Sequence, residues 1–458
     1  MIYEQFIQNK SIAALNIGFK ADENTYPKMI KDHQRVGVTW ALKRGRAALF
    51  FDTGLGKTLS QLTWGDQVAR KTGKPVLLLA PLAVSKQTLR EAEKFGIWAR
   101  IVTDQSQVGD GINITNYEKI HHFDCSKFGG VILDESSILK GINGKTRMLI
   151  TDCFANTPYK LSCTATPSPN DFMELGTQSE FLGIMSQVEM LAMFFIHDGG
   201  ETSKWRLKGH GKKRFFEWLA TWGMFLSSPA QLGFDSTGYD LPELVYHNHI
   251  VDTTPTDDLF ATPAMGLLER NKARKDSVVA RCEAAAAIVN AMTEPCMVWC
   301  NRNDESDLLE SMIHGAVSVS GSDTDEHKTD SMINFADNKL KCLISKPKIC
   351  GFGLNFQGSN TCVFVGLSDS WESLYQAIRR QWRFGQTRQV HAHIISADTE
   401  SGVIENIRRK DNQHKDLKSE MDLIMESYLK AEIFGAKVEK TDYTANHRIT
   451  IPSWMKTA

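Results

Sequence analysis

Short apolar runs alternate with helical patterns along the chain, and this alternation limits the possible folds more than any other feature. In the first half, amphipathic segments such as Val84–Phe95 and Lys145–Phe154 separate the apolar runs. Alternation of this kind predicts a parallel sheet with helices on both faces. The strands expected in the first half are Ala47–Phe51, Val76–Ala80, Val131–Leu133 and Tyr159–Thr164.

The same alternation restarts near residue 275. The clearest helices there are Asp330–Asn338 and Ser370–Phe384. A chain of 458 residues exceeds the usual size of one core, so two domains are the natural expectation. The second α/β lobe is predicted to contain the strands Met297–Cys300, Val317–Ser320, Cys342–Ser345, Cys362–Val365 and Val390–Ile395.

These patterns divide the chain into four parts. Residues 1–178 form the first α/β lobe and residues 243–398 the second. Between them, residues 179–242 contain few strand-like runs, several helical ones and a basic stretch. Residues 399–458 form a charged, helical tail that loses its periodicity near Asp442. We therefore expect two α/β lobes, a helical segment between them and a helical C-terminal tail.

Composition limits the partners and the compartment. The formal net charge is −1, so any contact with nucleic acid must come from locally clustered basic residues. The nine cysteines form no CxxC pair, which favours free thiols in a reducing cytoplasm. The N-terminus lacks the pattern of a signal peptide. The most apolar stretch, Phe181–His197, is short for a membrane span and contains Gln187 and Glu189, so no membrane association is expected.

A glycine-rich loop follows the first predicted strand, with the sequence Asp52-Thr53-Gly54-Leu55-Gly56-Lys57-Thr58. Gly54 and Gly56 allow backbone N–H groups to approach phosphate oxygens, and the next helix adds its positive N-terminus. Lys57 would contact the terminal phosphates of ATP, and the Thr58 hydroxyl would ligate Mg²⁺. The general phosphate-loop pattern has Gly at position 51, where this chain has Phe, so a simple glycine turn is the alternative.

Two carboxylates follow the apolar run Val131–Leu133. Asp134 stands at the carboxyl end of this predicted strand, where ligands bind in open α/β sheets. It would hold Mg²⁺, while Glu135 would orient and deprotonate the attacking water. A charge pair at a helix N-terminus is the alternative interpretation.

Taken together, these motifs make the chain resemble the superfamily-two helicases, specifically the Swi/Snf-type branch and its phage-encoded DEAD/DEAH-box relatives. The resemblance extends over residues 26–396 and implies two RecA-like lobes with ATP bound between them. Within it, Gln34 matches the residue that reads adenine, a task suited to an amide that both donates and accepts. Ala80-Pro81-Leu82 resembles a DNA-tracking motif. Leu161–Pro167 resembles the motif that couples hydrolysis to lobe movement.

The second lobe carries two further matches. Gly351–Asn355 resembles the glycine-rich element of the branch, and Gly353 would approach a phosphate or the other lobe. Gln376–Gln386 resembles the final helicase motif, in which Arg380 and Arg383 correspond to the two arginines. One or both would reach the γ-phosphate across the cleft, a contact worth about 10³–10⁵ in rate in related systems. A solvated basic helix is the alternative.

The chain also departs from its relatives at three places. Ser136-Ser137 follow the Asp-Glu pair, which argues against the RNA-unwinding DEAD-box branch. Arg379 stands where Swi/Snf-type proteins usually have Asp, and Cys350 stands where a first Gly is usual. These departures concern the subfamily and the coupling, and they leave the ATPase core unaffected.

Basic residues cluster within the segment between the lobes, in eleven residues that also hold Trp205 and lead into Phe215 and Phe216. Such a cluster binds phosphate without reading sequence, and aromatic side chains can stack on bases. We expect an inter-lobe DNA contact here, with a solvated charged loop as the alternative. The basic residues are Lys204, Arg206, Lys208, Lys212, Lys213 and Arg214.

The histidine pairs His247/His249 and His391/His393 alternate along predicted strands, and no carboxylate or cysteine accompanies them, so no metal site is expected. The sequence as a whole predicts an ATP- and Mg²⁺-dependent translocase or helicase that acts on DNA, with duplex DNA favoured. Its protein partners are unknown, and the phage-like resemblance suggests a bacterial or phage-infected cytoplasm. An RNA helicase and a nucleotide-gated scaffold on DNA are the alternatives.

Overall fold

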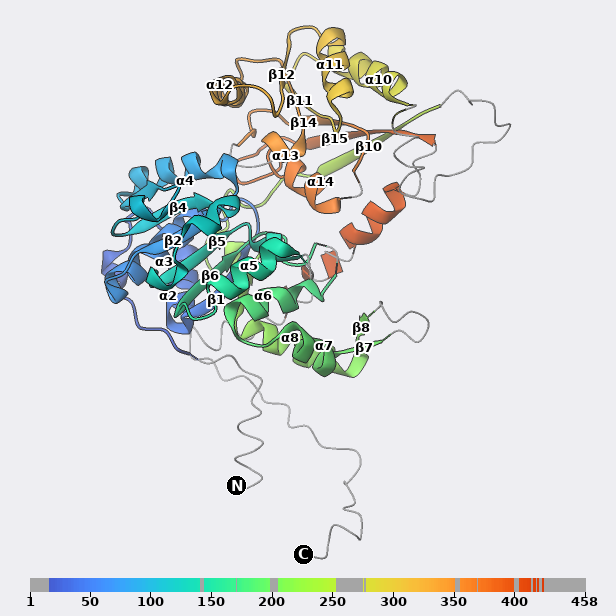
Figure 1. The fold of residues 1–458 in the computed structure, drawn as a ribbon. Helices are drawn as coiled ribbons and strands as arrows, with labels where there is room; N and C mark the ends of the chain where they lie inside the picture. Colours follow the sequence, from blue (N-terminus) through green and yellow to red (C-terminus); the bar gives the residue numbers. More distant parts are fainter. Residues whose placement is uncertain are drawn as a thin grey trace, which may run out of the picture.

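The computed structural model describes residues 16–140, 144–169, 171–197, 205–252, 275, 277–350, 355–368, 370–398, 403–412, 415–416, 418–419 and 422–423. Within these residues two parallel sheets, each flanked by helices, form two lobes (Figure 1). The predicted fold class is therefore confirmed. The described residues contain no helix that is both long and apolar enough to cross a membrane.

The first sheet has the strand order β3-β4-β2-β5-β6-β1-β9, and all of its pairings are parallel. The four strands predicted for this lobe are present, with ends shifted by at most one residue. The sheet consists of β1 (Arg46–Phe51), β2 (Val76–Ala80), β3 (Ala99–Ile101), β4 (Ile112–Asn116), β5 (Gly130–Asp134), β6 (Tyr159–Cys163) and β9 (Gly223–Leu226).

Helix α3 lies close against this sheet. A Cβ added at Gly65 of α3 would lie 3.0 Å from the Cδ1 atoms of Ile112 and Ile132, so the glycine permits the close packing. Trp64 beside it is fully buried. The helical elements of the lobe are η1 (Glu23–Thr25), α2 (Asp32–Arg44), α3 (Lys57–Thr72), α4 (Leu82–Phe95), η2 (Gln105–Gln107), η3 (Tyr117–His122), η4 (Cys125–Lys127), η5 (Ser136–Lys140), α5 (Lys145–Cys153) and α6 (Glu174–Leu182).

The segment after α6 is built onto the first lobe. Strand β9 pairs with β1 at the edge of the first sheet, so residues 223–226 belong to a lobe that the sequence analysis ended at residue 178. An aromatic cluster that includes Phe194, Phe215 and Trp218 packs the two helices that precede β9 against each other. The elements of this segment are α7 (Gln187–Phe194), the antiparallel strands β7 (Phe195–His197) and β8 (Trp205–Leu207), η6 (Gly209–Gly211), α8 (Lys212–Ala220) and η7 (Pro229–Leu232).

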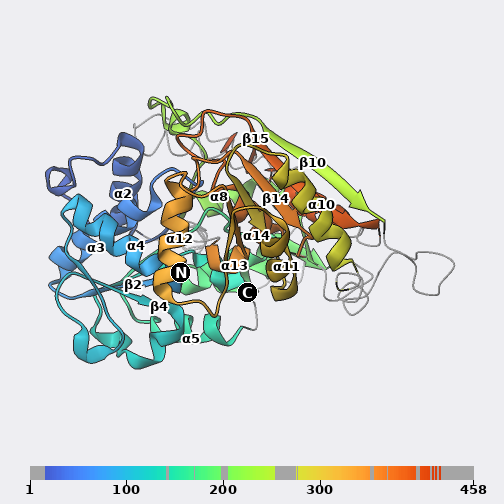
Figure 2. The same cartoon turned by 90° about the horizontal axis from the view of Figure 1, so that it is seen from above.

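The second sheet has the strand order β10-β15-β14-β11-β13-β12 and is also parallel. Helices cover both of its faces, and Figure 2 shows this lobe from above. The lobe consists of β10 (Leu244–Val251), α10 (Val278–Asn290), β11 (Cys296–Trp299), α11 (Asn303–Met312), β12 (Ala316–Val319), α12 (Asp325–Ala336), β13 (Cys342–Ser345), α13 (Pro347–Cys350), β14 (Thr361–Val365), α14 (Trp371–Ile378) and β15 (Val390–Ala397).

The helix predicted over Ser370–Phe384 is wrong in its second half, because α14 ends at Ile378. Beyond it, polar groups of the chain bond to neighbouring loops. The carbonyl of Arg380 accepts from Phe356 N at 2.8 Å, and the indole of Trp382 donates to Pro242 O at 2.7 Å. The arginines of this stretch are therefore held by a folded turn and not by the solvated basic helix considered above.

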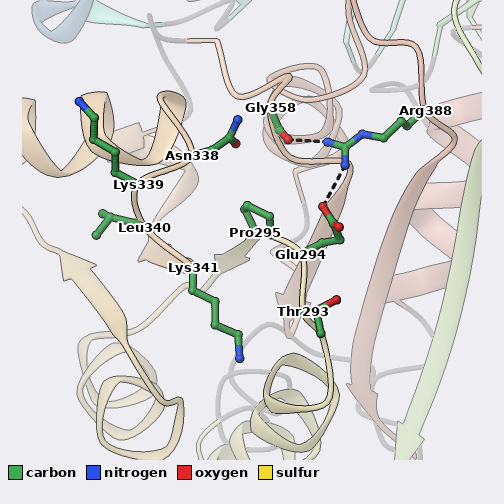
Figure 3. A pocket seen from close by; sticks show the side chains of 9 residues that line it. All are labelled: Thr293, Glu294, Pro295, Asn338, Lys339, Leu340, Lys341, Gly358 and Arg388. Carbon is green, nitrogen blue, oxygen red and sulfur yellow. Dashed lines mark hydrogen bonds and ion pairs between the residues drawn. The ribbon is translucent and has the colours of Figure 1, made fainter.

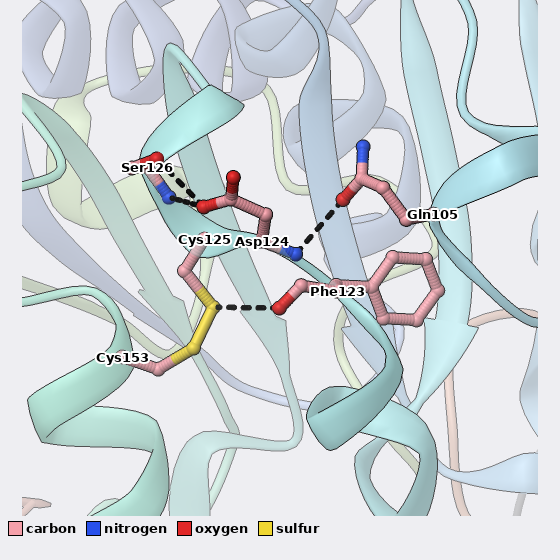
Figure 4. Close-up of a disulfide and its surroundings, with 6 residues drawn as sticks. All are labelled: Gln105, Phe123, Asp124, Cys125, Ser126 and Cys153. Carbon is pink, nitrogen blue, oxygen red and sulfur yellow. Dashed lines mark hydrogen bonds between the residues drawn. A yellow bond between two sulfur atoms is a disulfide. The ribbon is translucent and has the colours of Figure 1, made fainter.

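The expectation that all nine cysteines are free thiols is wrong for one pair. Cys125 in η4 and Cys153 at the end of α5 form a disulfide (Figure 4). Their Cα atoms are 5.6 Å apart, within the range that a disulfide spans. The two residues are 28 positions apart in sequence and lack a recognisable spacing, so only the fold brings them together. The other seven cysteines are free and buried.

Candidate active site

The glycine-rich loop joins β1 to α3, and its conformation depends on two glycines. Gly54 and Gly56 have φ angles of 94° and 76°, in the left-handed region that side chains disfavour. A Cβ at Gly56 would lie 1.8 Å from Nε2 of Gln34, so no side chain fits there. The loop leads directly into the N-terminus of the 16-residue helix α3. Backbone N–H groups and a helix terminus together suit the binding of phosphate.

Gln34, the predicted adenine reader, lies against this loop. Its Nε2 donates to Leu55 O at 3.1 Å, and its Oε1 accepts from Lys31 N at 3.0 Å. His33 also contacts Leu55 O, at 3.1 Å. The side chain of Gln34 is buried, so its observed contacts stabilise the shape of the loop. Contact with adenine stays a prediction.

Lys57 opens α3, and its side chain turns back over the loop. Its Nζ donates to Phe51 O at 2.9 Å and lies 3.4 Å from Asp52 O. Burial lowers the pKa of Lys57, while the charges of Glu135, Asp52 and Asp134 act in the opposite direction. The lysine therefore lies between the loop and the carboxylates. Thr58, the next residue of α3, is half-buried.

Asp134 and Glu135 lie at the carboxyl end of β5, as predicted. Oδ1 of Asp134 accepts from Gln61 Nε2 at 2.8 Å. Glu135 has a φ of 61°, which is strained for a residue other than glycine. Its Oε1 accepts from the hydroxyls of Ser137, at 3.0 Å, and of Thr164. Burial raises the pKa of both carboxyls, and the charge of Glu372 raises that of Glu135 further.

Arg380 reaches these carboxylates from the second lobe. It interacts electrostatically with Glu135 and Asp134, although burial lowers its pKa to about 10. Burial and repulsion from Arg380 lower the pKa of Arg383 to about 9, and Glu91 of the first lobe attracts it. The structure thus brings both predicted arginines to the first lobe, and Arg380 to the predicted catalytic pair.

Glu372 is a residue of the site that sequence reasoning missed. It lies in the first turn of α14, and its side chain is 9% exposed. It pairs with Lys140 of the first lobe and accepts from Thr166 Oγ1 at 3.3 Å. Thr164, two residues earlier, bonds to Glu135. A chain of contacts therefore joins Glu135 to the second lobe through the predicted coupling motif. No spacing in the sequence marks Glu372.

A cleft of about 690 Å³ opens between the lobes beside this site. Glu135 and Glu372 line it, as does Pro81 of the predicted DNA-tracking motif. Lysines from both lobes also line it, so the cleft combines positive charge with access to the predicted catalytic carboxylate. These lysines are Lys86, Lys140, Lys328 and Lys348.

The basic segment lies elsewhere. Figure 1 places β7 and β8 at the edge of the first lobe that faces away from the second sheet. Arg206, Lys212, Lys213 and Arg214 are exposed, whereas Lys208 donates from Nζ to the carbonyls of Ala192 and Met193 at 3.0 and 2.9 Å. The suggestion that Phe215 and Phe216 stack on bases is wrong, because both rings are buried in the core of the first lobe.

Two predicted residues, Lys204 and Gly353, lie outside the described residues. The histidine pairs, by contrast, come together on the paired strands β10 and β15. His247 Nε2 lies 3.0 Å from His391 Nδ1, and His249 Nε2 lies 3.0 Å from His393 Nδ1. Over the part of the chain that the structure describes, no group of three or more His, Cys, Asp or Glu residues is placed to hold a metal ion.

A second hollow, of about 600 Å³, lies at the amino ends of strands in the second sheet (Figure 3). Arg388 lies at one side of it and contacts Glu294 at 3.1 Å and the carbonyl of Gly358. Its lining comes from residues that precede β11, β13, β14 and β15. Ligands of open α/β sheets bind at the carboxyl ends of strands, so this hollow is separate from the nucleotide site.

Three comparisons with known proteins found matches to this chain. Residues 280–385 match the helicase conserved C-terminal domain family. The SWI/SNF-related matrix-associated actin-dependent regulator of chromatin subfamily A-like protein 1 of Drosophila melanogaster is 24% identical over 452 residues. This match covers 90% of the chain and 57% of the fly protein, so the chain spans little more than half of that relative's length. A solved structure, the Sulfolobus solfataricus SWI2/SNF2 ATPase core in complex with dsDNA, matches with a TM-score of 0.43 and 17% identity, over 90% of this chain and 98% of that chain.

Proposed function

We propose that the chain is a superfamily-two helicase of the Swi/Snf type and that it works as an ATP-dependent translocase on duplex DNA. The observation that carries the proposal is the meeting of two half-sites. The glycine-rich loop, Lys57, Asp134 and Glu135 come from the first lobe, and Arg380 comes from the second.

The residues of the first lobe have complementary tasks. The loop amides and Lys57 bind the phosphates of ATP. The hydroxyl of Thr58 and the carboxylate of Asp134 offer the oxygen ligands that Mg²⁺ prefers, and the ion, when bound, neutralises phosphate charge. Glu135 accepts the proton of the attacking water. Its raised pKa makes it a stronger base than an ordinary carboxylate.

The second lobe completes the site. Arg380 stabilises the charge of the transferring γ-phosphoryl group, and Arg383 lies beside it. The contacts from Glu135 through Thr164 and Thr166 to Glu372 give hydrolysis a route to the second lobe. A change at Glu135 therefore alters the contact between the lobes, which is the requirement for coupling hydrolysis to movement.

DNA is the proposed track, and the lysines of the inter-lobe cleft support this assignment. Clustered lysines bind the phosphate backbone without reading sequence. Lys140 is the informative member, because it lines the cleft and also pairs with Glu372. A phosphate that draws Lys140 away from Glu372 would change the contact between the lobes. The exposed residues Lys212, Lys213 and Arg214 form a second candidate contact with DNA.

ATPase assays of Lys57→Ala and Glu135→Gln test the proposal, with duplex DNA, single-stranded DNA or RNA added. Both variants should lose hydrolysis, whereas Lys74→Ala, which alters an exposed lysine beyond the far end of α3, should behave as wild type. Duplex DNA should stimulate the wild-type protein most. Wild-type turnover in both site variants would exclude the mechanism, and stimulation by RNA alone would assign the chain to RNA.

A nucleotide-gated scaffold on DNA differs from a translocase in what hydrolysis does. A scaffold binds DNA according to its nucleotide state and does not move along it. Displacement of a third strand from a DNA triplex separates the two functions, because only movement along the duplex removes that strand.

A further inference from the structure

Asp52, the first residue of the glycine-rich loop, contacts the second lobe and the C-terminal tail at once. Its Oδ1 accepts from Arg379 Nη2 at 2.6 Å and from the Tyr375 hydroxyl at 2.9 Å. Its Oδ2 accepts from Lys418 Nζ at 2.8 Å. Tyr375 and Arg379 belong to the second lobe and Lys418 to the tail. One carboxylate therefore joins the phosphate loop, the second lobe and the tail.

The pair of Asp52 and Arg379 is buried. Their side chains are 11% and 5% exposed. The guanidinium also donates to Thr53 O at 3.2 Å and lies over the rings of Trp382 and Tyr375, 4.9 and 5.6 Å from their centroids. Burial alone would raise the pKa of Asp52, but the charges of Arg379 and Lys418 outweigh it and hold that pKa well below its usual range. The carboxylate is thus ionised, and removing it would leave a buried arginine without its counter-charge.

The described part of the C-terminal tail also lies where the two lobes meet. Asp411 accepts from the indole of Trp371 in the second lobe at 3.1 Å, and Asp422 accepts from Ser227 in the first lobe at 3.2 Å. Lys418 lies between these two contacts in the sequence. In Figure 1 the helix of residues 403–412, coloured red, lies beside the junction of the lobes. The described part of the tail therefore contacts both lobes.

The position of Arg379 next to Arg380 links this contact between the lobes to ATP hydrolysis. Arg379 directly precedes Arg380, and both lie in the turn that follows α14. Fixing the Arg379 guanidinium on the phosphate loop therefore restrains the backbone that carries Arg380. The fit is close, because a Cβ at Gly54 would lie 3.0 Å from Phe384 N. A shift of about 1 Å in a catalytic group can cost about 10²-fold in rate.

We propose that Asp52 and Arg379 are positioning residues, which clamp the second lobe on the phosphate loop and thereby set Arg380 opposite Asp134 and Glu135, with Lys418 reinforcing the clamp from the tail. The proposal rests on the proposed ATPase function. It gives a role to Arg379, one of the residues at which the chain departs from the pattern of the family it resembles.

Steady-state ATP hydrolysis tests the proposal. Asp52→Asn and Arg379→Ala should lower kcat by about 10²-fold and change the KM for ATP little, because the displaced group acts on the transition state. Lys418→Ala should lower kcat less, since Lys418 is 38% exposed. Its effect should vanish in an Asp52→Asn background, because both changes remove the same contact. Lys415→Ala is the matched control, because Lys415 pairs with Asp411 inside the tail.

The distance between the lobes supplies a readout that does not need hydrolysis. Cysteines introduced at Met148 of α5 and Val279 of α10, which are 54% and 55% exposed, take a pair of dyes, because the described free cysteines are buried. Energy transfer should fall in Asp52→Asn and Lys418→Ala and stay unchanged in Lys415→Ala. Unchanged transfer and kcat in Asp52→Asn would overturn the clamp. A wild-type chain without ATPase activity would instead overturn the proposed function, and energy transfer would still report on the clamp.

Discussion

Replacing Gly56 with alanine tests the account of the phosphate loop by a change of one methyl group. Gly56 has a φ of 76°, and an L residue in this left-handed conformation costs about 1–2 kcal/mol. The new Cβ would also lie 1.8 Å from Nε2 of Gln34 and displace it. Leu55 O then loses its bond from that amide but keeps its contact with His33, so the loss costs about 0.5–1.5 kcal/mol. The sum is about 1.5–3.5 kcal/mol.

Gly73 supplies the matched control at the other end of α3. Its φ is 62°, also left-handed, but a Cβ there would meet nothing within 4 Å. Gly73→Ala should therefore cost only the conformational penalty of about 1–2 kcal/mol.

Two assays compare the variants, namely urea or thermal unfolding and the binding of a non-hydrolysable ATP analogue. Gly56→Ala should destabilise the protein by about 0.5–1.5 kcal/mol more than Gly73→Ala. It should also weaken nucleotide binding, because the loop amides are displaced. Gly73→Ala should keep the wild-type affinity. Equal stability and equal affinity in the two variants would refute the tight packing of Gln34 against the loop.

Four other substitutions have defined outcomes. Glu135→Gln should lower kcat by about 10²–10⁴-fold and retain ATP binding. The charge of Glu372 adds to burial in raising the pKa of Glu135. Glu372→Gln should therefore move the acid limb of the pH–rate profile to lower pH. Burial and the charge of Arg46 lower the pKa of Lys160 from 10.5 to about 7. Between these two pH values Lys160 is protonated in the unfolded chain and neutral in the folded protein. The free energy of unfolding should therefore rise with pH above 7. Unfolding free energies measured across that range should rise less steeply in Lys160→Met. Cys153→Ser opens a loop closed over 28 residues and should lower the unfolding free energy by about 3–4 kcal/mol in urea titrations, and an unchanged value would argue against the disulfide.

The sequence predicts the parts of the site that local chemistry determines. The apolar runs give the strands, and the residue types of the glycine-rich loop and of Asp134-Glu135 follow from what phosphate, Mg²⁺ and water require. The two lobes could be predicted because the strand-helix alternation restarts. Arg380 and Arg383 were identified by resemblance, since charge spacing alone is compatible with a solvated helix.

The remaining features depend on tertiary contact, which no local pattern specifies. Strand β9 is only four residues long and pairs with β1 across more than 170 positions, so its place in the first sheet has no sequence signal. Glu372 is one acidic residue in a helix N-terminal turn, where carboxylates are common. The α14 helix ends early because the next residues bond to loops of their own lobe and to Asp52. The Cys125–Cys153 pair likewise appears only in the folded chain.

Displacement of a third strand from a DNA triplex tests the central claim most directly, because it requires hydrolysis and movement together. The wild-type protein should release the strand in an ATP-dependent reaction. The Glu135→Gln protein should bind ATP and DNA but release none, and Lys74→Ala should match the wild type. ATP hydrolysis that duplex DNA stimulates, with the third strand left in place, would contradict translocation and favour a nucleotide-gated scaffold.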